Sequence, residues 1–151
     1  MIIKSITFAA LLVAASGAIA AQPSVWINLG GASYHPGSNG ALNDSNPGLG
    51  LEYHRNNGDY LAAGMYLNSI GKRSRYGVYA RQLASSGAVS LGVFGGIVDG
   101  YTGINNGGII PFGAPYMSIN GDRVGVNVIF IPGINPKVNS VFSVQFKLRI
   151  Q

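Results

Sequence analysis

Eight short segments of this chain alternate apolar residues with polar or small ones at a period of two. Such alternation predicts β-strands that present one apolar face. We expect strands at residues 24–33, 47–54, 60–68, 74–82, 88–98, 109–119, 123–131 and 140–150. An even number of short strands predicts an all-β fold, an eight-stranded antiparallel barrel.

The last segment, 140–150, shows the alternation most clearly. Its large apolar residues fall on one face: Phe142, Val144, Phe146, Leu148 and Ile150. Lys147 and Arg149 fall on the other face. In the segment 47–54, Glu52 likewise lies opposite an apolar face. Because an unpaired charge inside a narrow barrel is costly, we predict that Glu52 neutralises an interior Arg or Lys.

The composition favours contact with lipid. Apolar residues make up 47% of the chain and charged residues only 10%, whereas a water-soluble domain carries about 25% charged residues. The long uncharged stretch 100–121 contains Asn105, Asn106 and the prolines Pro111 and Pro115, so it cannot form a transmembrane helix. The spanning structure that remains is a closed transmembrane β-barrel. With no cysteines, its strand ladder has to replace disulfides.

Residues 1–20 match a cleaved secretory signal peptide. Lys4 precedes an apolar run over 6–15, and small residues end the segment at Ala18-Ile19-Ala20. The run is too short for a membrane-spanning helix, which needs about 20 apolar residues. We therefore expect export, a mature barrel domain at 21–151, and a location in the bacterial outer membrane.

The lengths of the connections predict the orientation of the barrel. Three connections are short: 55–59, 83–87 and Asn120-Gly121, and Asn-Gly is a strong hairpin signal. Three others are longer: 34–46, 99–108 and 132–139. The remaining connection, 69–73, is brief but falls at the same end as the long ones. Short periplasmic turns and longer outer loops are typical of outer-membrane barrels.

Charge and residue types exclude several other functions. The formal net charge is +5, but the basic residues are dispersed and no aromatic-plus-basic motif is present, which argues against nucleic acid as a partner. Anionic lipid head groups fit this charge better. With no cysteine and two distant histidines, His35 and His54, we expect no metal site and no cofactor. We expect a monomer.

Two residues at the predicted outer rim can act together, His35 and Ser69. A hydroxyl beside an imidazole can serve acyl transfer, because the histidine takes the hydroxyl proton while a carbonyl is attacked. One strand separates the two strands that carry them, so their ends lie about 10 Å apart and both loops must fold inward. The alternative is a loop histidine and a strand-capping serine. Lys72 and Arg73, beside Ser69, either bind lipid phosphate or are simply solvated.

Three segments resemble a known family: Ala88-Val89-Ser90-Leu91-Gly92-Val93-Phe94, Ile109-Ile110-Pro111 and Phe130-Ile131-Pro132-Gly133. On these segments the chain resembles the lipid A palmitoyltransferases of the PagP type, which are eight-stranded outer-membrane barrels. Pro115 and Pro132 match a family proline pair that opens a lateral route for lipid, and Pro47 also matches. Proline cannot donate to a strand ladder, so two on neighbouring strands are expected to make a local gap.

The resemblance also implies the site residues. The family's histidine after the first strand, and its Asp-Ser pair at the second outer loop, correspond to His35, Asn68 and Ser69. Asn68 stands where the family has aspartate, so it is expected to orient the imidazole without balancing imidazolium charge. Asp44 is the best substitute acid if Asn68 does not serve. Lys72 and Arg73 would hold lipid phosphate.

Two hypotheses for function follow. The first is an outer-membrane acyltransferase that moves a fatty acyl chain from phospholipid to lipid A. The second is a noncatalytic outer-membrane barrel with a structural or loop-binding role, favoured by Asn68 and by the absence of the family's N-terminal helix. A small pore is the least favoured, because side chains nearly fill an eight-stranded interior.

Overall fold

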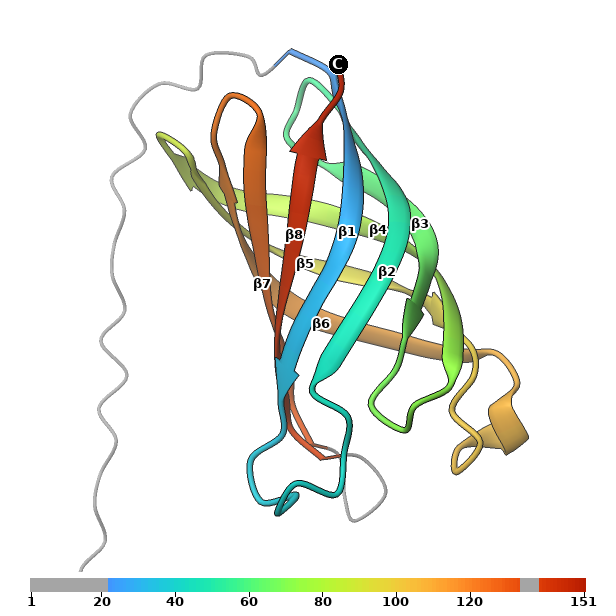
Figure 1. Cartoon of the computed structure of the whole chain (residues 1–151). Helices are drawn as coiled ribbons and strands as arrows, with labels where there is room; N and C mark the ends of the chain where they lie inside the picture. Colours follow the sequence, from blue (N-terminus) through green and yellow to red (C-terminus); the bar gives the residue numbers. More distant parts are fainter. Residues whose placement is uncertain (1–21, 134–138) are drawn as a thin grey trace, which may run out of the picture.

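The strands of this chain close into an antiparallel barrel. The structure is a computed structural model that describes residues 22–133 and 139–151; the expected signal peptide, 1–20, lies outside the described residues. The strands are β1 (Ser24–Tyr34), β2 (Ser45–His54), β3 (Tyr60–Leu67), β4 (Arg73–Ser86), β5 (Val89–Val98), β6 (Ile110–Asn120), β7 (Val124–Ile131) and β8 (Val141–Arg149). Each pairs with its sequence neighbours, and β8 pairs with β1 (Figure 1). The predicted eight-stranded antiparallel barrel is confirmed.

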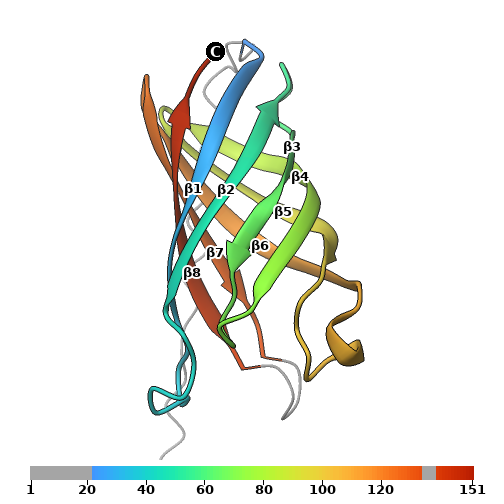
Figure 2. The ribbon, with the colours of Figure 1, turned by 45° about the vertical axis from the view of Figure 1, so that its right-hand side comes forward.

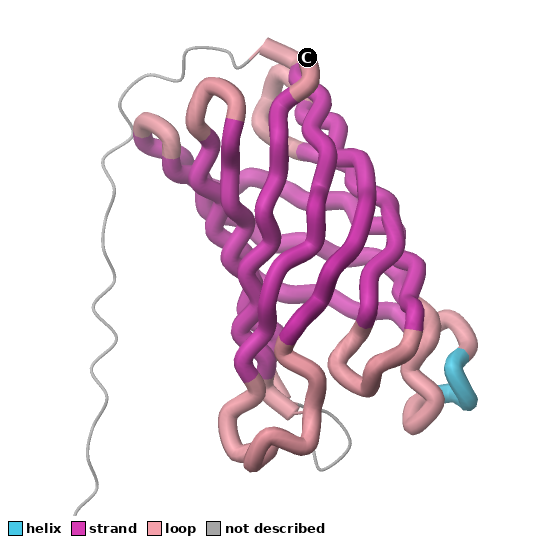
Figure 3. The backbone as a smooth tube through the Cα atoms, in the orientation of Figure 1, coloured by secondary structure: helices cyan, strands magenta, loops and turns pink. Residues whose placement is uncertain are grey.

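The connections fall at two ends of the barrel, as expected from their lengths. The loops after β1, β3 and β5 gather at one end, where β7 also ends and β8 begins, and the tight turns lie at the other (Figure 2). A short 3-10 turn, Asn105–Gly107, lies in the loop between β5 and β6 (Figure 3). Within the described residues, no helix is long and apolar enough to cross a membrane.

Two turns differ from the expected ones. β4 continues to Ser86, past its expected end at residue 82, so the turn that follows is far tighter than 83–87. A register shift between Gln82 and Ala84 lets the hairpin with β5 go on pairing beyond that point. The second turn is longer than the expected Asn120-Gly121 pair, because β6 ends at Asn120 and β7 begins only at Val124.

The expected alternation of inward and outward residues is present along the strands. On β8, Phe142, Phe146 and Leu148 are exposed on the outer surface, whereas Lys147 is buried inside. On β2, Leu49 and Leu51 are exposed and Glu52 is fully buried. The phase inferred from the sequence is therefore correct for both strands, and the apolar faces point outward.

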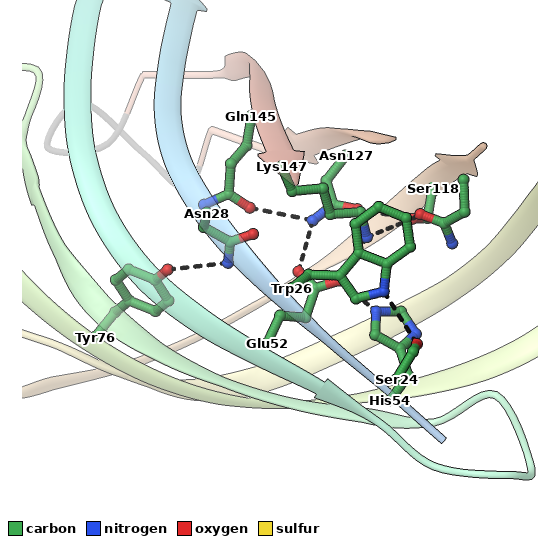
Figure 4. Close-up of polar contacts among 11 residues, drawn as sticks. Ser24, Trp26, Asn28, Glu52, His54, Tyr76, Ser118, Asn127, Gln145 and Lys147 are labelled. Carbon is green, nitrogen blue, oxygen red and sulfur yellow. Dashed lines mark hydrogen bonds and ion pairs between the residues drawn. The ribbon is translucent and has the colours of Figure 1, made fainter. Parts of the chain in front are cut away.

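A buried ion pair lies at the centre of a polar network inside the barrel. Lys147 Nζ lies 2.5 Å from Glu52 Oε1, and both side chains are fully shielded from solvent (Figure 4). Lys147 Nζ also donates to Ser118 Oγ at 3.0 Å, and Asn127 Nδ2 donates to Glu52 Oε2 at 3.0 Å. His54 hydrogen-bonds the same carboxylate. The prediction that Glu52 neutralises an interior cation is confirmed, and the cation is Lys147.

The ladder between β6 and β7 is incomplete. These strands pair only from Tyr116–Ile129 to Asn120–Gly125, although β6 extends back to Ile110. Pro115 immediately precedes Tyr116, the first residue of β6 that pairs with β7, and proline has no N–H to donate. The half of β6 nearer the loop end therefore lacks a hydrogen-bonded partner on the β7 side.

We predict that breaking the central ion pair destabilises the barrel. Glu52→Gln leaves the Lys147 ammonium buried without its counter-ion, and the free energy of unfolding should fall by about 3 to 5 kcal/mol. Urea unfolding in detergent micelles, followed by the fluorescence of Trp26, measures this fall. Trp26 is the chain's one tryptophan, and its ring centroid lies 5.1 Å from Lys147 Nζ.

The double variant Glu52→Gln/Lys147→Met is the control. Because it removes both charges, it should recover part of the lost stability. If Glu52→Gln unfolds at the same urea concentration as the native chain, the ion pair does not support the fold.

Candidate active site

Three side chains at the loop end form a hydrogen-bonded chain. The Nε2 atom of His35 lies 2.7 Å from Ser69 Oγ, and its Nδ1 atom lies 2.9 Å from Asp44 Oδ1. His35 follows β1, Asp44 precedes β2, and Ser69 follows β3. The imidazole is buried, with 3% of His35 exposed. The structure therefore brings together the predicted pair, His35 and Ser69, with Asp44, the acid named as the substitute for Asn68.

Hydrogen bonds from the backbone and side chain of Asn43 hold the two loops together. The N–H of Asn43 donates to Ser69 O at 2.7 Å, and Asn43 Nδ2 donates to Asn68 O at 3.1 Å. The loop after β1 can turn back on itself because Gly37, Asn39 and Gly40 adopt positive φ angles. These bonds supply the inward folding that contact between His35 and Ser69 requires.

Asn68 does not take the orienting position expected of it. Its Oδ1 accepts hydrogen bonds from the N–H groups of Ile70 at 3.1 Å and Lys72 at 2.9 Å. Its Nδ2 donates to Ser74 Oγ at 2.9 Å and to Gly100 O at 3.1 Å. The fully buried side chain thus organises the backbone after Ser69, and Asp44 occupies the place beside Nδ1.

The arrangement matches the geometry of a Ser-His-Asp triad. A carboxylate at Nδ1 accepts the Nδ1–H bond and fixes the tautomer in which Nε2 is the base. Nε2 then accepts the Ser69 hydroxyl proton at 2.7 Å, within the range for general-base catalysis. The Asp44 side chain is 55% exposed, so water partly screens its charge. Chemically, the group can activate Ser69 as a nucleophile toward an acyl carbonyl.

Ser69 lies on the wall of a cavity inside the barrel. The cavity has a volume of about 140 Å³ and opens to solvent at its mouth. It reaches Glu52 and Tyr60, beside the polar network. Much of its wall is apolar: Val78, Phe94, Phe112, Ile129, Ile131 and Val141. Several of these residues flank the unpaired part of the β6–β7 ladder, so the cavity lies next to the interrupted wall.

The three prolines expected to admit lipid differ in their surroundings. Pro115 lies where the β6–β7 ladder stops, and Pro132 directly follows the end of β7. Pro47 instead sits opposite Gly30, at a register shift in a ladder that continues to the pair of Ala32 and Ser45. Only the β6–β7 side therefore shows the expected gap, because a bulge at Gly30 accommodates Pro47 without ending the pairing.

Lys72 and Arg73 are exposed at the same end as Ser69. The neighbouring Arg75 pairs with Asp99, with 2.7 Å between Nη2 and Oδ2. The backbone N–H and guanidinium of Arg75 hold the pKa of Asp99 below its usual value. Asp99 is thus committed to Arg75, and Lys72 and Arg73 present positive charge at the rim.

His54 lies inside the barrel, in the polar network around Glu52. It stacks on Tyr60 with 4.9 Å between ring centroids. Among residues 22–133 and 139–151, no three His, Cys, Asp or Glu side chains gather closely enough to hold a metal ion.

Comparisons with known proteins add no relative. No protein-family model matches the chain, and no curated protein matches it significantly.

We predict that Asp44, rather than Asn68, orients His35. Asp44→Asn should slow the labelling of Ser69 by an alkyl fluorophosphonate at least about tenfold. The largest slowing we expect is roughly 10⁴-fold, the loss known for replacing a buried triad aspartate. Intact-protein mass spectrometry follows the labelling over time. Asp122→Asn, in the turn at the opposite end of the barrel, is the matched control and should label at the native rate. Equal rates for Asp44→Asn and the native chain would remove Asp44 from the site.

Proposed function

We propose that this chain is an outer-membrane acyltransferase that moves a fatty acyl chain from phospholipid to lipid A. The observation that carries the proposal is the chain of hydrogen bonds from Asp44 through His35 to Ser69, on the wall of an apolar cavity in a barrel. In this proposal Ser69 is the nucleophile, His35 the general base and acid, and Asp44 the orienting carboxylate.

The outer surface supports a place in a membrane. Leu49, Leu51, Leu61 and Phe146 are each more than half exposed. Soluble proteins rarely expose contiguous apolar patches of large area. A closed barrel leaves no strand edge unpaired at its seam, which is the condition for crossing a bilayer with strands. Export by the expected signal peptide would deliver the chain to the outer membrane.

The reaction we propose has two halves. Ser69 Oγ attacks the ester carbonyl carbon of the phospholipid while its proton passes to His35 Nε2, and the carbonyl electron pair moves to oxygen. Collapse expels the lysophospholipid alkoxide, which takes the proton from His35 and leaves the acyl chain on Ser69. A hydroxyl of lipid A then attacks the carbonyl carbon of this ester while its proton passes to His35 Nε2. The Ser69 alkoxide leaves and takes the proton back from His35, so that the acyl chain ends on lipid A.

Lipid access is assigned to the β6–β7 side. The ladder there ends at Tyr116, so an acyl chain can pass from the bilayer into the cavity without breaking strand hydrogen bonds. The apolar lining accommodates the chain, and its depth is limited by the Glu52–Lys147 network. At the rim, Lys72 and Arg73 would hold lipid phosphate.

The other hypotheses fit the geometry less well. A noncatalytic barrel has no need for a buried histidine bonded to a serine and an aspartate. A pore requires an open lumen, whereas the Glu52–Lys147 network fills part of it.

The test is mass spectrometry of lipid A from outer membranes of cells that express the chain. The native chain should add one acyl chain, and Ser69→Ala should abolish the addition while still showing the heat-modifiable migration of a folded barrel. Ser38→Ala, in the loop after β1, is the control and should transfer normally. Retained transfer by Ser69→Ala contradicts the proposal, and release of free fatty acid without lipid A modification would indicate a hydrolase.

The basic rim gives a separate prediction. Replacing both Lys72 and Arg73 with Gln should raise KM for phospholipid several-fold and change kcat little, because exposed charges mainly attract the head group. Arg123→Gln, at the opposite end, is the control. The rise should shrink as salt is added; a KM that stays at the native value would show that the two residues are only solvated.

A further inference from the structure

The backbone after Ser69 has little capacity to stabilise an oxyanion. In many serine enzymes the N–H group after the nucleophile donates to the developing charge on the carbonyl oxygen. Here the N–H groups of Ile70 and Lys72 donate to Asn68 Oδ1, and that of Gly71 donates to Asn68 O at 3.0 Å. The three amides that follow Ser69 are therefore already used within their own loop, so none of them is free to donate to an oxyanion.

Two tyrosine hydroxyls lie in the same cavity wall as Ser69. Tyr66, from β3, and Tyr101, from the loop after β5, both line the cavity. Their hydroxyl oxygens are 2.8 Å apart. The ring of Tyr66 packs edge-on against Tyr76, with 6.0 Å between centroids, which fixes its position. One phenol can thus donate a hydrogen bond to the oxygen of the other, and the O–H of that second phenol stays free to donate to a ligand.

Asn68 ties the loop of Tyr101 to the loop of Ser69. Its Nδ2 bonds the carbonyl of Gly100, the residue directly before Tyr101, at 3.1 Å. Gly100 has φ of +88°, and a Cβ there would lie 2.4 Å from Arg73 O, so only glycine permits this approach. The loop then folds back, because the N–H of Ile104 donates to Tyr101 O at 2.8 Å. The bond from Asn68 to Gly100 and the bond from Ile104 to Tyr101 together fix the position of Tyr101 beside Ser69.

We propose that the Tyr101 hydroxyl is the oxyanion donor for Ser69, with Tyr66 as the residue that positions it. This inference rests on the proposed acyl transfer. When Ser69 Oγ attacks the carbonyl carbon, the carbonyl electron pair becomes an oxyanion, and the Tyr101 O–H donates a hydrogen bond to it without losing its proton. Tyr66 donates in turn to the Tyr101 oxygen, which strengthens the bond that Tyr101 gives.

The ionisation of Tyr101 is consistent with this role. Burial raises the pKa of Tyr101, and contacts with the Tyr66 and Ser69 hydroxyls partly oppose the rise. The phenol is therefore protonated near neutral pH and remains a donor.

The test compares Tyr101→Phe, Tyr66→Phe and Ser69→Ala in acyl transfer from phospholipid vesicles to lipid A. Tyr101→Phe keeps the ring and removes the donor, so kcat should fall by about 10²- to 10³-fold with KM nearly unchanged. Tyr66→Phe should lower kcat by a smaller factor. Tyr53→Phe, whose ring is exposed on the outer surface of β2, is the matched control and should keep native kcat.

The outcomes separate the two proposals. If Ser69→Ala is inactive and Tyr101→Phe retains kcat within about twofold of the native value, the oxyanion assignment is overturned and the acyltransferase stands. If Ser69→Ala retains transfer, the acyltransferase mechanism fails and the Tyr101 assignment fails with it. Heat-modifiable migration of each variant shows that the barrel has folded.

Discussion

The pairing of β8 with β1 is the constraint on which the rest of the structure depends. It turns an eight-stranded sheet into a ring, so no edge strand is left with unpaired backbone groups at the seam. Closure also fixes which side chains face inward, because residues alternate between lumen and exterior along every strand. The interior that results is narrow, and each polar group inside it needs a partner from another strand.

The lumen is polar in one part of its length and apolar in another. The Glu52–Lys147 pair, with Asn127 and Ser118, forms a fully buried polar network joining β2, β6, β7 and β8. Beyond it, toward the long loops, the wall becomes apolar and the β6–β7 ladder stops. An open, apolar chamber next to an interrupted wall is therefore possible because the polar network holds the strands together elsewhere.

The strands and their phase could be predicted from the sequence, because period-two alternation is a local signal that a half-buried strand must carry. The need of Glu52 for a partner was predictable for the same reason, but its identity was not. Glu52 and Lys147 meet only after β8 closes on β1, and no local pattern contains that long-range register.

The site was predictable in part. The positions of His35 and Ser69 at one rim follow from strand order, and the structure places them in contact. Asp44 was named as the substitute acid, but the choice between Asn68 and Asp44 could not be made from the sequence, because it depends on how the loop after β1 turns back through positive φ angles at Gly37, Asn39 and Gly40. Tyr101 was missed for a similar reason: its approach to Ser69 depends on the hydrogen bond from Asn68 to Gly100.

The proposed acyl transfer requires Ser69 to carry the acyl chain as a covalent ester. The most direct measurement is peptide mass spectrometry after rapid acid quenching of the native chain with phospholipid vesicles that contain no lipid A. We expect the peptide that contains Ser69 to gain the mass of one fatty acyl group, and we expect added lipid A to remove this group. An unmodified Ser69 peptide, from a preparation that transfers acyl chains once lipid A is supplied, would contradict the covalent mechanism.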